Sequence, residues 1–294
     1  MTPTENTTTT AENTRKTVLR SSLGILSTAT ATHGTGRDGD IPLPRLPGFV
    51  ESAFSPLAYE AARLCLAERP GDGSRTAVAL ASTAGDTTTA DLASRRMVSG
   101  RVHNPLLFMQ ATPNSVLGYL SREFRITGQM FSLSTLDDPV TELLSMADLL
   151  LEDPEVERVL VLGVELGGSE RLAAVYEELA DGRGHPASTS ALPADAGLAA
   201  AVLLGRPGTG TPVSVRSAEA YEGDGGTGAD GTGTRVQPGS IQSLFGLVGL
   251  HRRLLREGGS HVLVTDPRVP AFTLTVTADT DTDARNETET HAHQ

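Results

Sequence analysis

Short apolar runs alternate with amphipathic stretches through most of the chain. The apolar runs predict strands, and apolar residues at helical spacing predict helices. The expected strands are Thr17–Ile25, Thr76–Ala81, Arg158–Leu166, Ala199–Gly205, Val213–Ala220, His261–Thr265 and Phe272–Thr277. The expected helices are Glu51–Arg69, Pro139–Leu151, Ser169–Ala180 and Ile241–Arg256. Continuous apolar strands separated by helices indicate a sheet that is buried on both faces, and therefore a layered α/β fold.

The first of these helices carries the single cysteine of the chain. Its helical spacing places one set of side chains on a common face: Phe54, Leu57, Ala58, Ala61, Leu64 and Cys65. A buried core thiol is the favoured interpretation of Cys65, and a reactive thiol is the alternative. One cysteine excludes a disulfide within the chain and a cysteine-based zinc site, and it fits a reducing, cytoplasmic location.

The charge balance narrows the class of partner. The 294 residues include 24 Lys and Arg against 36 Asp and Glu, which gives a net charge of −12. Nucleic-acid binding requires clustered positive charge, and anionic membranes repel an acidic surface, so we expect neither partner. No apolar run is long enough for a membrane span, and the opening MTPTENTTTTAENT has no signal-peptide pattern. We also expect no cofactor, since no phosphate or dinucleotide motif is present, and no metal, since no histidines outside the C-terminal tail pair at metal-ligand spacing.

The central region contains, in this order, a turn, a glycine, a second turn and the end of a strand. Residues 112–138 read TPNSVLGYLSREFRITGQMFSLSTLDD, with a Pro113-Asn114-Ser115 turn, Gly118, an Ile126-Thr127-Gly128 turn and a strand ending in Ser132-Leu133-Ser134-Thr135. This segment resembles the centre of the β-ketoacyl synthases, which belong to the thiolase superfamily. Further segments resemble the same family in the same order: Val18–Ser27, Val159–Glu165, Asp195–Gly205 and Ser240–Leu250.

The resemblance implies a thiolase-like layered fold whose C-terminal half is shortened. We expect a disordered tail at residues 1–14, a ketosynthase-like N-terminal half at 15–206 and a reduced C-terminal half at 207–277. An acidic tail at 278–294 and a Gly/Thr/Asp loop at Glu222–Gly239 complete the organisation, because neither could bury enough surface to become ordered. The reduced second half puts the full five-layer arrangement of the family in doubt.

The side chains that perform the family's chemistry are missing at the matching positions. The resemblance places Asp137 where the family has its nucleophilic cysteine, and it places Gln242 and Leu247 where a lysine and a histidine belong. A leucine can neither donate a hydrogen bond nor carry charge, so condensation by this chain alone is not expected. Asp138 followed by Pro139 is the simpler pattern of a helix cap. The Thr32–Gly36 segment (THGTG) resembles the family's histidine motif in letters, but it lies in the wrong half and predicts a flexible loop.

Ketosynthase-like chains without the cysteine are known as chain-length factors, and the resemblance implies that role here. Such a subunit forms a heterodimer with an active β-ketoacyl synthase of type II polyketide or fatty-acid-type biosynthesis and shapes the acyl tunnel. The expected interface strand is about Gln129–Thr135, and an exposed edge strand of this kind needs a partner. Acyl carrier proteins are acidic, so we expect them to dock on the partner. The candidate tunnel or interface residues are Phe108, Met109, Asn114, Phe131, Ser134 and Thr135, with core packing an equal alternative for the first two.

Two other functions stay open at this point. Asp137 with Ser134 or Thr135 could support an independent acyl-thioester hydrolase or transferase, although the sequence supplies no base for it. The chain could also form a structural homodimer that ignores every ketosynthase.

Overall fold

The computed structural model describes residues 18–100, 106–135, 138–168, 173–174, 177–178, 192–193, 196–208, 210–218, 240–265 and 271–277. The expected tails at 1–14 and 278–294 and the expected loop Glu222–Gly239 lie outside these residues. Most of the expected helix Ser169–Ala180 and the lost-nucleophile position Asp137 lie outside them as well.

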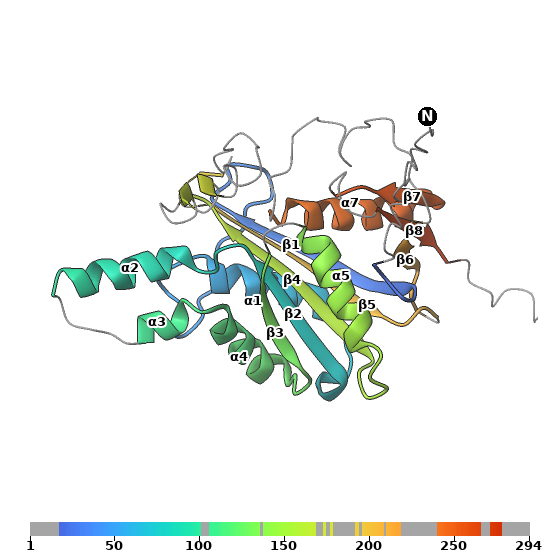
Figure 1. Cartoon of the computed structure of the whole chain (residues 1–294), viewed down its shortest axis with the longest axis horizontal. Coiled ribbons are helices and arrows are strands. Elements are labelled where there is room, and N and C mark those ends of the chain that lie inside the picture. Colours follow the sequence, from blue (N-terminus) through green and yellow to red (C-terminus); the bar gives the residue numbers. More distant parts are fainter. Residues whose placement is uncertain are drawn as a thin grey trace, which may run out of the picture.

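A single mixed sheet of eight strands forms the centre of the described structure, in the order β3-β2-β4-β5-β1-β6-β8-β7 (Figure 1). The strands are β1 Leu23–His33, β2 Thr76–Ser82, β3 Met130–Ser134, β4 Arg158–Leu166, β5 Gly197–Gly205, β6 Val213–Ser217, β7 Ser260–Leu263 and β8 Phe272–Val276. Strands β3, β2 and β4 are parallel, and every other neighbouring pair is antiparallel. The carboxyl ends of β2, β3 and β4 therefore meet at one edge of the sheet.

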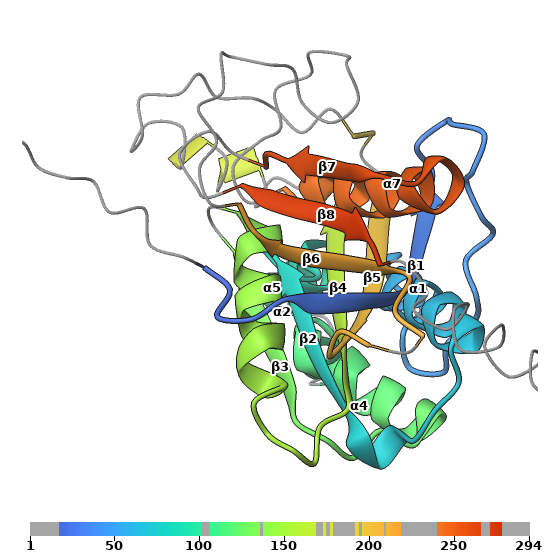
Figure 2. The same cartoon turned by 90° about the vertical axis from the view of Figure 1, so that its right-hand side faces the viewer.

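Helices cover both faces of the sheet (Figure 2). The alternation along β2 sends Val78 and Leu80 into one core with α1 (Phe54–Glu68) and α4 (Pro113–Phe124). It sends Ala77, Ala79 and Ala81 into a second core with α5 (Pro139–Leu150) and α7 (Gln242–Glu257). The remaining helices are the 3₁₀ turn η1 (Gly73–Arg75), α2 (Thr87–Val98) and α3 (Leu106–Gln110). This arrangement confirms the expected layered α/β fold.

Three expectations about local structure are wrong. The first strand begins at Leu23 and continues to His33, so Thr32 and His33 end a strand instead of forming a flexible loop. The following turn is also ordered, because Asp40 accepts hydrogen bonds from Thr35 Oγ1 at 2.7 Å and from the Gly36 amide at 2.9 Å. Leu64 is 38% exposed, so it lies off the buried face of α1 that its neighbours form.

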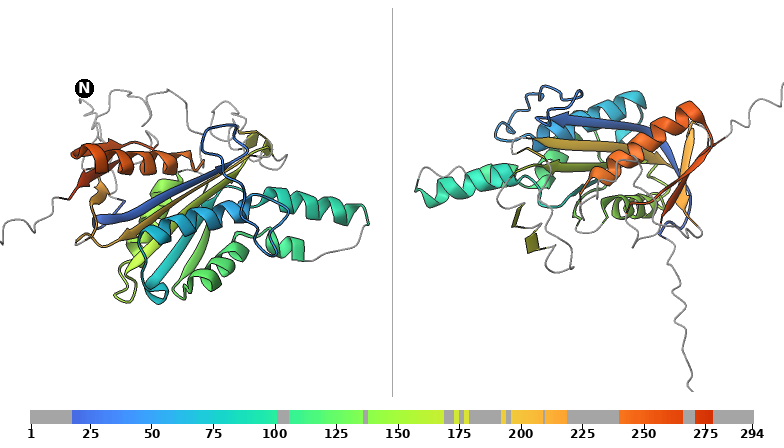
Figure 3. Two further views of the ribbon diagram at one scale, coloured as in Figure 1. Left: turned by 180° about the vertical axis from the view of Figure 1, so that it is seen from behind. Right: turned by 90° about the horizontal axis from the view of Figure 1, so that it is seen from above.

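Strands β6, β8 and β7, from the last third of the chain, extend the same sheet (Figure 3). Along β6 and β8, the apolar residues Val213, Val215 and Leu274 are buried in the core that α7 covers. The alternate residues on the opposite face are polar and partly or fully exposed: Ser214, Arg216, Thr273 and Thr275. Such one-sided patterning is typical of antiparallel strands with one solvated face. Among the described residues, the polar face of β6 and β8 therefore requires no covering layer.

Candidate functional site

The carboxyl ends of β2, β3 and β4 form the place where the family resemblance puts the reacting groups. Strand β3 ends at Ser134, whose hydroxyl donates a 2.9 Å hydrogen bond to the Thr83 carbonyl just beyond β2. That contact directs the Ser134 proton to a main-chain carbonyl, which is not a general base. The next residue, Thr135, is fully buried, and its hydroxyl has no hydrogen-bond partner among the described residues.

Helix α5 begins next to these strand ends and is capped by Asp138. This carboxylate accepts hydrogen bonds from the Thr141 amide at 3.2 Å and from Thr265 Oγ1 at 2.7 Å, and it also contacts Thr141 Oγ1. Pro139 occupies the first turn, which confirms the predicted helix cap. The hydrogen bond from Thr265 was not predicted from the sequence. It connects the segment after β7 to the start of α5.

A buried carboxylate at the end of β4 holds the start of α7. Glu165 is 4% exposed, and its Oε2 accepts hydrogen bonds from Ser240 Oγ at 2.8 Å and from the Ile241 amide at 3.0 Å. Negative charge at a helix N-terminus is favourable because the helix dipole is positive there. Sequence analysis missed this role, although a lone acidic residue at the end of an apolar strand was a visible signal.

The positions expected for the lost lysine and histidine lie on α7. Gln242 is the first residue of the helix, and Leu247 is fully buried in the core shared with α5. The helix lies unusually close to the sheet at Gly163 of β4, where an added Cβ would lie 3.0 Å from both Ile241 Cγ2 and Leu244 Cδ2. Leu247 therefore lies among apolar side chains of the sheet and of α5.

Among the described residues, a small cavity lies near the carboxyl ends of these strands. A cavity of about 10 Å³ lies between the loop after β2 and the end of β4, lined by Ser82, Thr83, Ala84, Gly85, Thr87, Glu165 and Leu166. A volume of roughly 10–15 Å³ holds about one water molecule. This cavity therefore offers no room for an acyl chain.

Five of the six candidate tunnel or interface residues lie on the outside of the molecule, and Thr135 is the buried exception. Phe108 and Met109 of α3 are 43% and 63% exposed, and Phe131 of the edge strand β3 is 37% exposed. Core packing, the alternative interpretation of Phe108 and Met109, is therefore wrong. Asn114 of α4 is also exposed, and its Oδ1 accepts a 2.8 Å hydrogen bond from Ser132 Oγ of β3. The structure thus places α3, the start of α4 and the edge of β3 on neighbouring surface.

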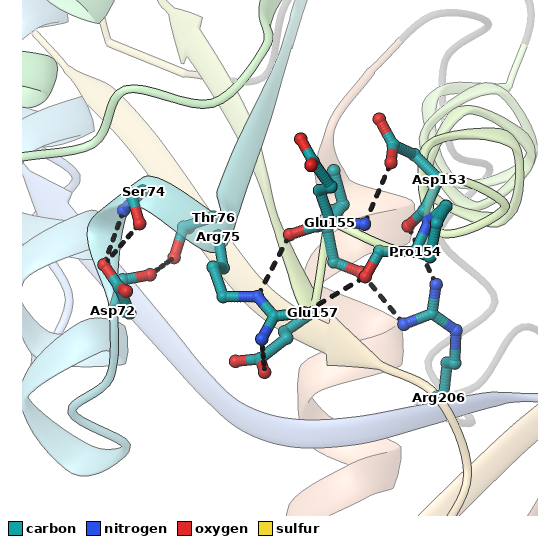
Figure 4. A network of polar contacts seen from close by, with 10 residues as sticks. Asp72, Ser74, Arg75, Thr76, Asp153, Pro154, Glu155, Glu157 and Arg206 are labelled. Atoms are coloured by element: carbon teal, nitrogen blue, oxygen red, sulfur yellow. Dashed lines mark hydrogen bonds and ion pairs between the residues drawn. The ribbon is translucent and has the colours of Figure 1, made fainter.

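A structural polar network lies at the opposite end of these strands, where β2 and β4 begin and β5 ends (Figure 4). Arg75 pairs with Glu157 at 2.7 Å and donates to the carbonyls of Glu155 and Pro154. Arg206 donates to the carbonyls of Val156 and Asp153 at 2.9 Å and contacts that of Leu151. These arginines therefore fasten the turn between α5 and β4.

The single cysteine belongs to the core, as expected. Cys65 is fully buried, and its sulfur lies 3.2 Å from Ser27 Oγ of β1. Burial raises the pKa of the thiol to about 11, so the nucleophilic thiolate is disfavoured. In the described parts of the chain, no three His, Cys, Asp or Glu residues are grouped as metal ligands, and no helix is long and apolar enough to span a bilayer.

Comparison with known proteins gives matches in solved structures alone. No protein-family model matches the chain, and neither does any curated protein. A chain from the complex of the ketosynthase ApeO with its chain length factor ApeC from Xenorhabdus doucetiae matches with a TM-score of 0.54 and 16% identity. The match covers 86% of this chain and 99% of that chain, so the matched chain is short as well.

Two further solved structures are similar over a smaller part. They are the AntDE:AntF complex of a type II polyketide synthase acyl-carrier protein with its ketosynthase (TM-score 0.47, 15% identity) and the ishigamide ketosynthase/chain length factor (TM-score 0.43, 16% identity). The match covers 64% of this chain and 63% of the former, and 66% of this chain and 65% of the latter. The chain thus spans just under two thirds of either protein. From the match over 86% of this chain and 99% of the first matched chain, we conclude that this chain shares the fold of a chain from that ketosynthase–chain length factor complex.

Proposed function

We propose that the chain is a non-catalytic, chain-length-factor-like subunit that pairs with an active β-ketoacyl synthase. The partner would perform the condensation in type II polyketide or fatty-acid-type biosynthesis. The observation that carries the proposal is the edge strand β3, which is open and partly apolar in a fold shared with a ketosynthase–chain length factor complex.

The open edge supports association through β3. Natural edge strands are usually blunted by charge, proline, a bulge or very short length, since unpaired main-chain groups otherwise invite pairing. Strand β3, with the sequence Met-Phe-Ser-Leu-Ser, carries no charge and no proline, and Phe131 is exposed on it. The other edge strand, β7, has only four residues and follows Gly258 and Gly259.

The residues at the positions of the family's catalytic side chains favour a non-catalytic role. Leu247 contributes only apolar packing, and Ser134 donates its proton to a carbonyl. Asp137 replaces the cysteine in the sequence, and a carboxylate is a poor nucleophile toward a thioester. The remaining alternative of a hydrolase therefore lacks an activated nucleophile in the described residues.

The location of the apolar side chains supports a contribution to the partner's tunnel. The cavity at the strand ends holds about one water molecule, whereas Phe108 and Met109 are exposed on α3, next to the helix α4 that contacts β3. A subunit of this shape can form a wall of a tunnel that lies mainly in its partner. The net charge of −12 favours docking of an acidic acyl carrier protein on that partner.

Co-purification tests the proposal directly. The tagged chain is co-expressed with each ketosynthase of the same genome, and the mass of each eluted complex is measured. We expect a one-to-one complex whose condensation activity requires both chains and the active-site cysteine of the partner. A stable oligomer of this chain alone, which binds none of the ketosynthases, would contradict the proposal and favour the homodimer.

A matched pair of variants locates the interface. Phe131→Asp places a charge on β3, and we expect the recovered complex to fall by about tenfold or more, because an interface core tolerates unpaired charge poorly. Val262→Asp introduces the same charge on the opposite edge strand β7, where Val262 is 44% exposed, and should leave the complex intact. Equal loss in both variants would argue against β3 as the interface.

A further inference from the structure

Helices α2 and α3 form an arm that projects beyond the β3 side of the sheet, as the views from the front and from behind both show (Figures 1 and 3). Ala93 is the last buried residue of α2. Beyond it, Met97 and Val98 are 50% and 89% exposed, and Leu106 of α3 is 54% exposed. The arm, defined here as residues 87–98 and 106–110, thus presents apolar side chains to solvent at its far end.

The first attachment of the arm is a buried carboxylate. Asp86 is 3% exposed and caps α2 by accepting a 3.0 Å hydrogen bond from the Thr89 amide. Its other oxygen accepts from Ser52 Oγ at 2.6 Å and from Thr89 Oγ1 at 2.7 Å. In the last turn of α2, Arg96 lies 3.6 Å from Glu51, so the segment before α1 holds the arm at two points.

The second attachment is a single carbonyl at the end of α3. Met109 O accepts hydrogen bonds from the Thr112 amide at 3.2 Å and from Thr112 Oγ1 at 2.8 Å, and Ser115 Oγ also contacts it. These donors fix α3 against the first turn of α4. Because both ends of the arm are anchored, little conformational entropy remains to be lost when its apolar surface is covered.

The arm is continuous with the edge strand that the proposed function assigns to the partner. Asn114, in the first turn of α4, accepts the 2.8 Å hydrogen bond from Ser132 of β3. Each of these elements carries an exposed apolar residue: Phe131 on β3, Met109 on α3 and Val98 at the tip of α2. One positive charge also lies near the tip, since Arg95 is exposed there and forms no ion pair among the described residues of this acidic chain.

From this anchoring, continuity and charge, we infer that the arm is a clasp that grips the same ketosynthase partner, in an apolar groove with an acidic rim. The inference rests on the proposed function, because the partner is the one that binds at β3. Strand β3 sets the position of the partner, and the clasp slows its release. Met97 and Val98 are the contact residues at the tip, and Asp86 is a positioning residue that holds the arm in place.

The dissociation rate of the complex tests the clasp. The partner ketosynthase is immobilised, and release of this chain is followed by surface plasmon resonance. We expect the double variant Met97→Ser/Val98→Ser to dissociate about tenfold faster or more, as loss of an apolar anchor does in interfaces. Its melting temperature should match that of the unmodified chain. The control Leu149→Ser/Leu255→Ser removes apolar side chains of 50% and 48% exposure from α5 and α7 and should leave dissociation unchanged.

Charge at the tip gives an independent readout. Arg95→Glu should slow association and reverse the sign of its salt dependence at the acidic rim. Wild-type kinetics for both arm variants, together with loss of the complex in Phe131→Asp, would overturn the clasp and leave the proposed function standing. An unmodified chain that binds no ketosynthase would overturn the proposed function and the clasp together.

Discussion

The Ser132 hydroxyl of β3 donates a 2.8 Å hydrogen bond to Asn114 Oδ1 of α4 and thereby joins the edge strand to the helix that carries the arm. Asn114 is exposed, so we expect Asn114→Ala to lower the free energy of unfolding by less than about 1 kcal/mol. Its effect on partner affinity should be larger, because the relative placement of β3 and α3 depends on this contact.

A double-mutant cycle measures that coupling. The dissociation constant is determined for Asn114→Ala, Ser132→Ala and the double variant against the partner ketosynthase. If the hydrogen bond positions the surface, the double variant will be no weaker than either single variant. Strictly additive losses would mean that the two residues act separately.

Arg206 stabilises the end of α5 through three carbonyl groups. Because cations near a helix C-terminus and charge-assisted hydrogen bonds are both favourable, we expect Arg206→Ala to cost about 1–2 kcal/mol of unfolding free energy. Arg206→Lys should recover only part of this loss, since an ammonium group does not reproduce the fork of the guanidinium. Urea denaturation of the two variants measures the difference, and equal stability of alanine and arginine at this position would refute the role.

His251 makes the stability of the fold depend on pH. It is 2% exposed on the sheet-facing side of α7, its Nδ1 lies 3.1 Å from Thr28 Oγ1, and its Nε2 has no partner among the described residues. Burial, with a smaller effect of Arg252, lowers the pKa of this imidazole from 6.5 to about 4. The unfolded chain therefore takes up a proton near pH 6.5, whereas the folded chain does so only near pH 4.

The stability contributed by neutral His251 is full above about pH 6.5 and is lost as the pH falls through this window toward about 4. The loss amounts to about 3 kcal/mol, since each pKa unit corresponds to about 1.4 kcal/mol. Chemical denaturation at a series of pH values should show this slope in the unmodified chain and a shallower one in His251→Gln. His261→Gln is the control, and a slope that His251→Gln leaves unchanged would assign the effect to other groups.

Arg125 is the single described residue other than glycine with a positive φ, at 54°, and it ends α4 in the left-handed region. Side chains with a Cβ are disfavoured there, so Arg125→Gly should raise the free energy of unfolding by about 0.5–1 kcal/mol. Arg122→Gly makes the same replacement inside α4 and should lower it by about 1 kcal/mol. Thermal unfolding should therefore shift in opposite directions for the two variants.

The elements that the sequence predicts best are those buried on both faces. Strand β4 has the predicted bounds Arg158–Leu166, because its apolar run is continuous and ends at turn residues. Strand β1 was placed too early because its second half alternates Ala with Thr and ends in His33, a weakly apolar pattern. Helix α2 was not predicted, since it is Thr-rich and polar, although Asp86 before it was an available cap signal.

The candidate site was predictable in part. Local signals sufficed for Asp138, whose cap lies within three residues of its partner in sequence. Contacts between distant segments were not available from pattern alone: Glu165 reaches Ser240, 75 residues away, and Thr265 reaches Asp138 across 127 residues. The outward placement of Phe108 and Met109 depends in the same way on how α3 is attached to α4.

The two edge strands of the sheet differ, and the difference limits how many chains can join by strand addition. One end is the uncharged strand β3, and the other is the four-residue strand β7. Once one protein has added its strand to β3, the composite sheet has no second adhesive end on this side of the complex. Growth by repeated strand addition, which produces fibres when both ends of a sheet are open, stops after the first step. Under the proposed function, this asymmetry limits the assembly to the one partner that pairs with β3.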